Sequence, residues 1–454
     1  MGMDKVSTSK SKIFKYWDRI RSSFWFLPVI MSGGAMALAS VTIVLDGPIT
    51  DWFRMALGWK FSGGAEGASA VMATVTGSMI TIAGVVFSMI LVALTLTSSQ
   101  LGPRLLRNFM RDTTTQVVLG TFVATFLYCL LVLRTIKRED EGAFVPHLSV
   151  TLGVLFAVVS VGVLIYFIHH VSVSIQANEI VAKVGLELIE GIDQLFPERT
   201  GQEAPPRKAE PPDAAFLDVF GREARPVDAE GDGYLQFIDT ETLTALAAEE
   251  DIVIRIELRP GHYLVAGCPL VQVLPGDRVT DELTRRINSA FALGRERMPR
   301  QDIEFVVNQL VEIAVRALSP GLNDPFTAIA CVDRLGSALC RLVKRDTPSL
   351  YFRDEQDRLR VIAAAVTFPV IMDTAFNQIR QYGRSSASVT IRMLETIAMI
   401  ATFAHRQEDR AALLRHAEMI SRGARDGLPE EYDRRVVEEC CNVVSQLCCR
   451  EDTR

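Results

Sequence analysis

Four long stretches without a charged residue lie in the first 170 positions, and they constrain the fold more than any other feature. They cover residues 24–45, 67–103, 113–133 and 143–170. A helix needs about 20 apolar residues to cross the hydrocarbon core of a bilayer. Core helices of soluble proteins show a polar face, which these stretches largely lack. We therefore expect a four-helix transmembrane domain over residues 24–170.

The basic amino-terminal tail, residues 1–23, raises the alternative of a cleaved signal peptide. The first stretch is too long for the apolar region of a signal peptide, and no Ala-x-Ala cleavage motif follows it. Lys and Arg are in excess in this tail and in the loop after span 2, which favours the cytoplasmic side for both. We predict a multi-pass protein with both termini in the cytoplasm.

The part of the chain after residue 170 is acidic. The formal net charge of the whole chain is −6, although the first 170 residues are net positive. An acidic domain without a basic cluster is not typical of nucleic-acid binding. We expect the lipid bilayer as a partner and no nucleic acid.

Span 4 is expected to continue beyond the bilayer. Apolar residues keep helical spacing through residues 171–196, and no proline intervenes before Pro197. We predict one continuous helix from about residue 143 to 195, whose second part is a stalk that couples the membrane to the cytoplasmic domain. Residues 197–232, with six prolines and many charges, are predicted to form a linker or flexible loop.

Residues 233–279 are predicted to form a small β-module. Strands are expected at 234–239, 252–258, 262–265 and 270–274, with a short helix at 240–249. The pattern resembles the small β-sandwich of lipoyl- and biotinyl-type domains. However, residues 209–343 contain no lysine that could carry a swinging-arm cofactor, so we expect no cofactor.

Residues 280–454 have helical periodicity with polar faces throughout, which predicts a helical bundle. The expected helices cover residues 301–318, 326–344, 354–382, 387–405, 410–423 and 430–449. The predicted fold class is therefore mainly α: a four-helix transmembrane domain followed by a cytoplasmic α+β domain, which combines the β-module with the bundle.

The cysteine doublets Cys440–Cys441 and Cys448–Cys449 suggest a zinc site. On a helix, Cys441 and Cys448 would lie about 10 Å apart along the axis, too far to share a metal ion. We therefore expect small apolar residues on a terminal helix, and no metal. The sequence contains no recognisable nucleotide loop, nucleophile elbow or paired catalytic carboxylates. We expect no catalytic residues and no enzyme.

The second span carries a stripe of mostly hydroxyl residues with a period of 3.5 residues. It consists of Thr74, Ser78, Thr81, Val85, Ser88, Val92, Thr95 and Ser99. One interpretation is a pore-lining helix in a ring of subunits, with Val85 and Val92 as constrictions. The other is a packing seam, because small and hydroxyl residues also line helix interfaces in membranes.

Basic residues follow this stripe at the cytoplasmic end of span 2. Arg104, Arg107 and Arg111 share one helix face, and in a ring they would concentrate anions at an inner mouth. Anchoring to lipid phosphates is the alternative. No acidic residue lies within a span, which argues against a carboxylate proton relay, and only His169 and His170 near the end of span 4 are candidates for pH sensing.

The segment 316–328 joins two expected helices. Asn323 suits helix-ending geometry, and Asp324 suits a helix cap with Pro325 at the first helical position. This structural role accounts for most of the motif. A second interpretation is a binding site for a small anionic ligand at Arg316, Asn323 and Asp324.

Several strings in the sequence resemble a large family of uncharacterised bacterial inner-membrane proteins that carry a domain of unknown function. They are Phe24-Trp-Phe-Leu-Pro28, Gly77-Ser-Met-Ile-Thr-Ile-Ala-Gly-Val-Val-Phe-Ser88, Ser98-Ser-Gln-Leu-Gly-Pro-Arg-Leu-Leu-Arg-Asn-Phe109, Phe144-Val-Pro-His-Leu-Ser-Val150, Tyr166-Phe-Ile-His-His170 and Ala317-Leu-Ser-Pro-Gly-Leu-Asn-Asp-Pro325. The resemblance covers nearly the whole chain. It implies a location in the bacterial inner (plasma) membrane and supplies no activity.

The leading functional hypothesis is a homo-oligomeric ion channel. Span 2 would line the pore, the arginines would give a preference for anions, and the cytoplasmic domain would gate the pore through the stalk. The alternative is a membrane-anchored sensor or scaffold whose cytoplasmic domain binds a ligand or a partner. We also expect span 1 to act as an anchor and span 3 to face lipid.

Overall fold

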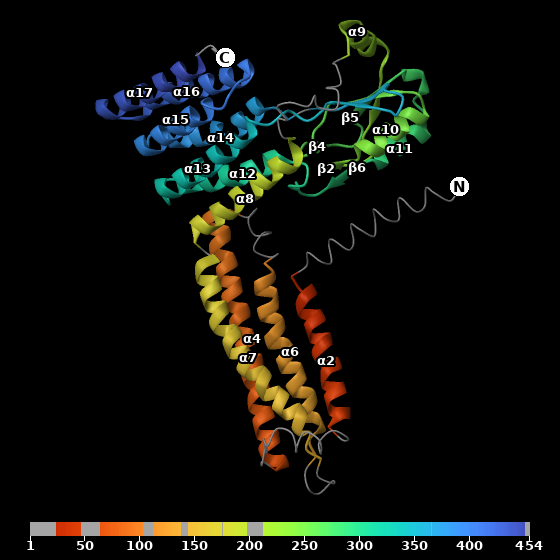
Figure 1. The fold of residues 1–454 in the computed structure, drawn as a ribbon, viewed down its shortest axis with the longest axis vertical. Coiled ribbons are helices and arrows are strands. Elements are labelled where there is room, and N and C mark those ends of the chain that lie inside the picture. Colours follow the sequence, from red (N-terminus) through yellow and green to blue (C-terminus); the bar gives the residue numbers. More distant parts are fainter. Residues whose placement is uncertain are drawn as a thin grey trace. The chain divides into compact units, whose positions relative to one another are not determined.

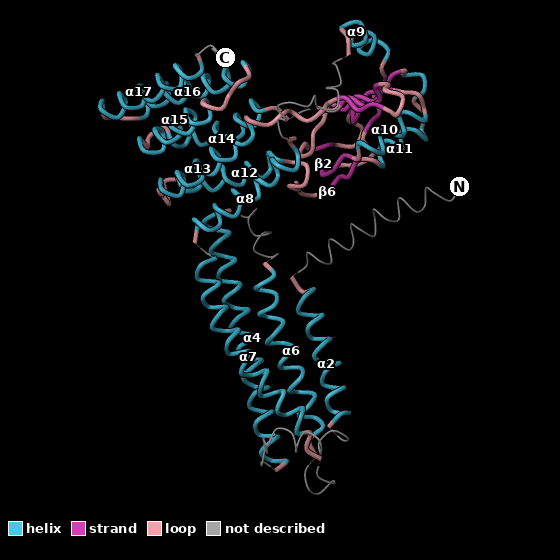
Figure 2. Tube along the Cα trace, in the orientation of Figure 1, coloured by secondary structure: helices cyan, strands magenta, loops and turns pink. Residues whose placement is uncertain are grey.

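The computed structural model of the chain describes residues 24–46, 64–102, 112–137, 144–174, 176–197, 212–364 and 366–449. The chain divides into two compact units, Met1–Gln176 and Ala177–Arg454. Helices dominate both units, and the named strands lie in the second (Figures 1 and 2). The predicted fold class is confirmed, because four long apolar helices are followed by a domain of small sheets and helices.

In the described part of the first unit, four helices are long and apolar enough to cross a membrane. They are α2 (Phe26–Leu45), α4 (Ala65–Leu101), α6 (Thr113–Thr135) and α7 (His147–Ser174). Helix α6 packs against the other three, and a larger share of it is buried within the unit than of any of them. The expectation that the third span faces lipid is therefore wrong, because α6 is the central helix.

Close helix crossings place α6 at the centre. A Cβ atom at Gly120 would lie 2.6 Å from Met31 Sδ, so glycine is what lets α2 approach α6 so closely. A Cβ atom at Gly153 of α7 would lie 3.0 Å from Met72 Sδ and 3.4 Å from Cys129 Sγ, where α4, α6 and α7 meet. Small residues at such crossings allow helix backbones to approach in membranes.

The Asp46 carboxylate, directly after α2, caps the amino-terminal end of α7. The backbone N–H of Leu148 donates to Asp46 Oδ1 at 2.7 Å, and the backbone N–H and hydroxyl of Ser149 donate to Oδ2 at 3.0 and 2.6 Å. The N–H groups of a first helical turn have no acceptor within the helix, and the helix dipole favours a negative charge there. One buried carboxylate therefore ties the first of these helices to the last.

Tyr128 of α6 joins the same network from inside the unit. Its buried hydroxyl donates to the carbonyl of Ser149 at 3.2 Å and shares a hydrogen bond of 3.2 Å with Thr42 Oγ1 of α2. Farther along, the hydroxyls of Thr125 and Ser160 lie 3.2 Å apart between α6 and α7. Side-chain hydrogen bonds therefore supplement apolar packing between these helices.

The helix predicted to run unbroken from span 4 into the stalk is divided. Helix α7 ends at Ser174, Gln176 is not helical, and helix α8 (Ala177–Leu195) begins the second unit. Helix α8 has a strongly amphipathic sequence, and its apolar face is buried against two helices of the second unit, α12 (Ile303–Ala317) and α13 (Pro325–Leu342). Residues 177–195 are thus an integral part of a helical bundle rather than an isolated stalk.

The strands of the second unit form two sheets. The five-stranded sheet has the order β1-β5-β3-β8-β7, and the three-stranded sheet has the order β4-β2-β6. The strands are β1 (Arg225–Asp228), β2 (Gly233–Ile238), β3 (Val253–Ile256), β4 (Tyr263–Leu264), β5 (Pro269–Leu274), β6 (Phe291–Gly294), β7 (Tyr351–Arg353) and β8 (Leu359–Ile362). Buried residues of both sheets share one apolar core with helices α10 (Thr240–Glu249) and α11 (Asp281–Ser289).

The β-containing part exceeds the bounds expected for it, 233–279. It begins with β1 inside the expected linker, where helix α9 (Ala214–Glu223) also lies, and the short 3-10 helix η3 (Gly276–Arg278) packs against β1 and β5. It also includes β6 and the hairpin β7–β8, which come from residues 291–294 and 351–362, inside the range predicted to be a helical bundle. Strand β8 pairs in parallel with β3, with Ile254 opposite Val361. The helix expected at 354–382 is therefore wrong in its first part.

The remaining helices form the helical part of the second unit. Besides α8, α12 and α13 they are α14 (Phe368–Gly383), α15 (Ala387–Ala401), α16 (Gln407–Gly427) and α17 (Glu431–Cys448). Apart from the start of α14, they lie close to the ranges predicted from periodicity. The chain leaves this part after α13 to form β7 and β8 and returns at α14.

The cap on α7 gives a stability prediction. We expect Asp46→Ala to destabilise the full chain by about 1–3 kcal/mol, because it removes a helix cap and leaves buried donors without an acceptor. Thermal unfolding of the purified protein in detergent measures this effect. Ser40→Ala is the matched control, since Ser40 is exposed on α2 and its hydroxyl donates to the carbonyl of Met36 in its own helix. Equal unfolding temperatures for the two variants would contradict the capping role.

Candidate functional site

One face of α4 is buried against its neighbours α6 and α7. The buried residues are Ala68, Met72, Thr76, Met79, Ala83, Val86, Ile90, Ala93 and Thr97. From Met72 onward, each of them is followed two positions later by a member of the stripe predicted from the sequence. Two residues correspond to a rotation of about 200° around a helix. The stripe therefore lies on the side of α4 opposite the packing face.

All eight stripe residues are exposed in the unit, and the valines at positions 85 and 92 are 55% and 65% exposed. Among the described residues, the stripe is consequently not packed against another segment of the same chain. A seam between copies of the chain and a pore lining both remain compatible with this geometry.

The stripe hydroxyls donate hydrogen bonds to their own helix. Those of Thr74, Ser78, Thr81 and Thr95 donate to the carbonyl four residues earlier, and that of Ser99 to the carbonyl three residues earlier, at 2.8–3.0 Å. These five hydroxyl donors are thus satisfied without water, while each oxygen keeps acceptor capacity on the exposed side. The face is tolerable in lipid and also suited to water.

Two glycines lie beside the stripe. A Cβ atom at Gly77 or Gly84 would have no described atom within 4 Å, so the exposed face of α4 is open there to a second helix. Arg104, Arg107 and Arg111, predicted at the inner mouth, lie outside the described residues.

Of the two histidines at the end of span 4, His170 contacts a carboxylate group. His170 Nε2 lies 2.9 Å from Asp112 Oδ2, and the same carboxylate accepts a hydrogen bond of 2.7 Å from the hydroxyl of Thr115 at the start of α6. The ring of His170 also stacks on Tyr166, with 5.9 Å between the ring centroids. His169 belongs to the same helix. The contact between Asp112 and His170 ties the start of α6 to the end of α7.

The segment between α12 and α13 forms a tight helix-to-helix connection. Asn323 has a φ of +46°, the left-handed geometry expected at a helix end. Asp324 caps α13, because the backbone N–H groups of Phe326 and Thr327 donate to its Oδ1, both at 3.1 Å. Arg316 pairs with Glu312 of its own helix at 3.4 Å. The structure thus accounts for the motif by capping, while binding of an anionic ligand there stays a prediction.

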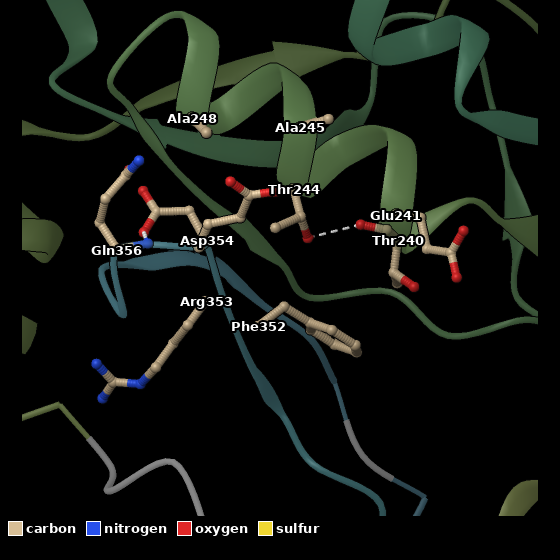
Figure 3. Close-up of a pocket in the computed structure, with 10 residues that line it drawn as sticks. Thr240, Glu241, Thr244, Ala245, Ala248, Phe352, Arg353, Asp354 and Gln356 are labelled. Atoms are coloured by element: carbon tan, nitrogen blue, oxygen red, sulfur yellow. Dashed lines mark hydrogen bonds between the residues drawn. The ribbon is translucent and has the colours of Figure 1, made fainter.

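A cavity of about 530 Å³ lies elsewhere, between α10 and the β7–β8 turn (Figure 3). Thr240, Glu241, Thr244, Ala245 and Ala248 line it from α10, and residues 352–356 line it from the hairpin. Among the described residues, Glu241 and Glu355 form no ion pair, whereas the charge of Arg353 is paired with the Asp357 carboxylate, with Nε 4.0 Å from Oδ1. The available charge at the cavity is therefore negative, which suits a cationic ligand with an apolar body.

Sequence reasoning missed this cavity because residues 354–382 were expected to be one helix. The signal was the pair Asp354 and Asp357, because aspartate favours turns. Asp357 indeed adopts a φ of +62° at the hairpin turn.

A buried arginine fixes the hairpin that forms one wall of the cavity. Arg360 Nε donates to Asp354 Oδ2 at 2.8 Å, and its Nη2 donates to Asp251 Oδ1 at 3.0 Å. Burial raises the pKa of the Asp354 carboxyl, but the hydrogen bonds and charges of Arg360 and Arg358 outweigh this and lower it to about 2. The wall is thus held by a carboxylate that stays ionised at neutral pH.

The cysteines considered for zinc binding lie on α17 or at its end, and burial raises the pKa of the Cys440, Cys441 and Cys448 thiols. Within the described ranges no group of three or more His, Cys, Asp or Glu side chains is placed to hold a metal ion.

One carboxyl group of the second unit is buried without hydrogen bonds. Asp409, in the first turn of α16, is 1% exposed, and neither of its carboxyl oxygens has a hydrogen-bond partner among the described residues. Arg406 Nη1 lies 3.9 Å from Oδ2, beyond hydrogen-bond distance. Burial raises the pKa of this carboxyl to about 6, although the charge of Arg406 opposes the shift.

Comparison with known proteins gives a family match. The family model described as "Predicted membrane protein (DUF2254)" matches residues 21–399. Uncharacterized proteins of Mycobacterium bovis and of Mycobacterium tuberculosis (strain H37Rv) are each 34% identical over 429 residues, which cover 92% of this chain and 80% of the relative. No solved structure matches.

Asp409 gives a pH-dependent prediction. Since its folded pKa lies above the ordinary value near 4, folding favours the protonated form, and stability is lost as the pH rises through about 6. We expect Asp409→Asn to remove this loss and to stabilise the protein at pH 8 by up to about 3 kcal/mol, with little effect at pH 4. Unfolding temperatures at both pH values measure the effect. Glu408→Gln is the exposed control, and a similar gain for both variants would contradict the prediction.

Proposed function

We propose that this chain, which belongs to the DUF2254 family of predicted membrane proteins, is a homo-oligomeric ion channel of the bacterial inner membrane. The exposed stripe of α4 lines the pore in this proposal. The observation that carries it is the position of the stripe, diametrically opposite the face that α4 buries in its own unit.

The composition of the stripe supports a wet surface. A face in contact only with lipid gains nothing from six hydroxyl groups, whereas water or a permeating ion can use their oxygen atoms as hydrogen-bond partners or ligands. The two valines interrupt the hydroxyl positions and provide apolar constrictions. A ring of subunits is required, because a single helix cannot enclose a pathway.

Selectivity and gating follow from parts on either side of the stripe. A ring of Arg104, Arg107 and Arg111 at the cytoplasmic mouth would favour anions. Helix α8 belongs to the second unit, so a movement of that unit reaches α7 through the short junction at Gln176. Both termini lie in the cytoplasm in this proposal, as the positive residues of the tail and of the second loop favour.

The cavity supports a second candidate function, a membrane-anchored sensor. The second unit would bind a cationic ligand between α10 and the β7–β8 turn, and the helices of the first unit would serve as an anchor. Transport measurements separate the two candidates. If the purified protein in liposomes passes no chloride, potassium or protons under any voltage or pH, the channel proposal is overturned and the sensor is favoured.

The stripe itself is tested by Ser88→Leu. We expect about a tenfold or larger loss of ion flux, since an added apolar side chain raises the barrier to a hydrated ion, and about 1.4 kcal/mol suffices for this factor. Flux assays in liposomes and the mass of the detergent-solubilised oligomer are both measured.

Val158→Leu on α7 is the matched control, because Val158 is 64% exposed but lies on a different helix. The control should conduct normally. A Ser88→Leu protein that falls apart into single chains would show instead that the stripe is a seam between copies.

A further inference from the structure

The connection between α12 and α13 exposes large apolar side chains. Leu322 of the connection is 47% exposed and Phe326, in the first turn of α13, is 82% exposed, although capping hydrogen bonds hold the backbone there. A rigid turn that presents a phenylalanine and a leucine to the outside is suited to inserting them into an apolar phase. We call residues 319–326 the apolar tip.

Helices α8 and α13 run in the same direction, and their contacts define how they align. A Cβ atom at Gly185 would lie 3.1 Å from Arg334 Cβ. Eight residues later on α8, Asp193 pairs with Arg341 and, at 2.7 Å, with Arg345. The difference in residue number between contacting residues of α8 and α13 is therefore nearly constant along the two helices.

This alignment places the apolar tip beside the first residue of α8. Counting back from the contact at Gly185, Ala177 lies level with Phe326. The antiparallel helix α12 gives the same result. A Cβ atom at Gly191 of α8 would lie 3.0 Å from Ile303 of α12. Fourteen residues lead from Gly191 back to Ala177 and from Ile303 on to Ala317, so Ala177 lies level with the end of α12. Figure 1 shows α8 lying along both helices.

Chain connectivity limits how far this end of α8 can lie from α7. Three steps along the backbone lead from Ser174, the last residue of α7, to Ala177. They span at most about 11 Å. The tip is therefore level with a residue that follows the fourth membrane-capable helix almost directly.

Residues typical of a membrane interface lie at the same end. A Cβ atom at Gly383 would lie 3.6 Å from Leu318 Cδ1, so the end of α14 lies against the end of α12. Next to Gly383 are Tyr382, which is 53% exposed, and the exposed Arg384. Aromatic side chains favour the headgroup region of a bilayer, and arginines pair with lipid phosphates.

We propose that the apolar tip inserts Leu322 and Phe326 into the headgroup region of the bilayer. The second unit would thus hold the membrane at two points, through the covalent junction at Gln176 and through this tip. The inference does not depend on ion conduction and applies equally to a sensor.

Site-specific photo-crosslinking tests the contact in the full chain. Phe326→p-benzoylphenylalanine is prepared in nanodiscs of phosphatidylethanolamine and phosphatidylglycerol, and adducts are identified by mass spectrometry after irradiation. Met399→p-benzoylphenylalanine is the matched control. Met399 is 50% exposed on α15, about 18 Å along this helix from its start next to α14.

We expect lipid adducts at position 326 and no lipid adducts at position 399. Leu322→p-benzoylphenylalanine should give lipid adducts as well. Adducts at position 326 to protein instead of lipid, whether within one chain or between two copies, would overturn the proposal. So would equal lipid labelling at positions 326 and 399, or no adduct at position 326. Since 326 is an exposed position, unchanged unfolding temperatures should show that each labelled protein is folded.

Discussion

Carboxylates at helix ends hold the first unit together, because apolar packing alone cannot order helices that are apolar on all sides. Asp46 satisfies the first N–H groups of α7 from the end of α2, and Asp112 joins the start of α6 to His170 of α7. Each contact can form only between two particular helices, and only when they are aligned at one position along their axes. The central position of α6, the burial of one face of α4 and the exposure of the other all presuppose this arrangement.

The two faces of α4 differ in composition. Its packing face is built from small and flexible residues such as Ala83, Met72 and Met79, which fit against α6 and α7. Among the described residues of the unit, no contact requires hydroxyl groups on the opposite side. A chain that only needed an anchor could carry leucine there, and this contrast is the reason for proposing that the face lines a pore.

The sequence predicted the membrane-capable helices well, because length and absence of charge are properties of each segment alone. It could not predict which of them is central, since in α6 the buried Phe122 and Val118 and the exposed Val117 are equally apolar. The helices of the second unit were also predictable, because there the contrast between polar and apolar faces is strong. The α4 stripe could be found by its period, but its direction relative to the packing face needed the structure. The cavity was hidden, since its two walls come from residues more than 100 positions apart.

The insertion of β7 and β8 between two helices has a consequence for the order in which the protein is made. Strand β3 pairs with β5 soon after both are synthesised, but its other edge waits for β8, about a hundred residues later. By then α12 and α13 have already been made. A nascent chain therefore carries an open strand edge throughout the synthesis of these two helices, and such edges invite pairing with other chains. The sheet becomes complete only when the helical part has begun to form, so neither part can be produced as an independent domain by cutting the chain once.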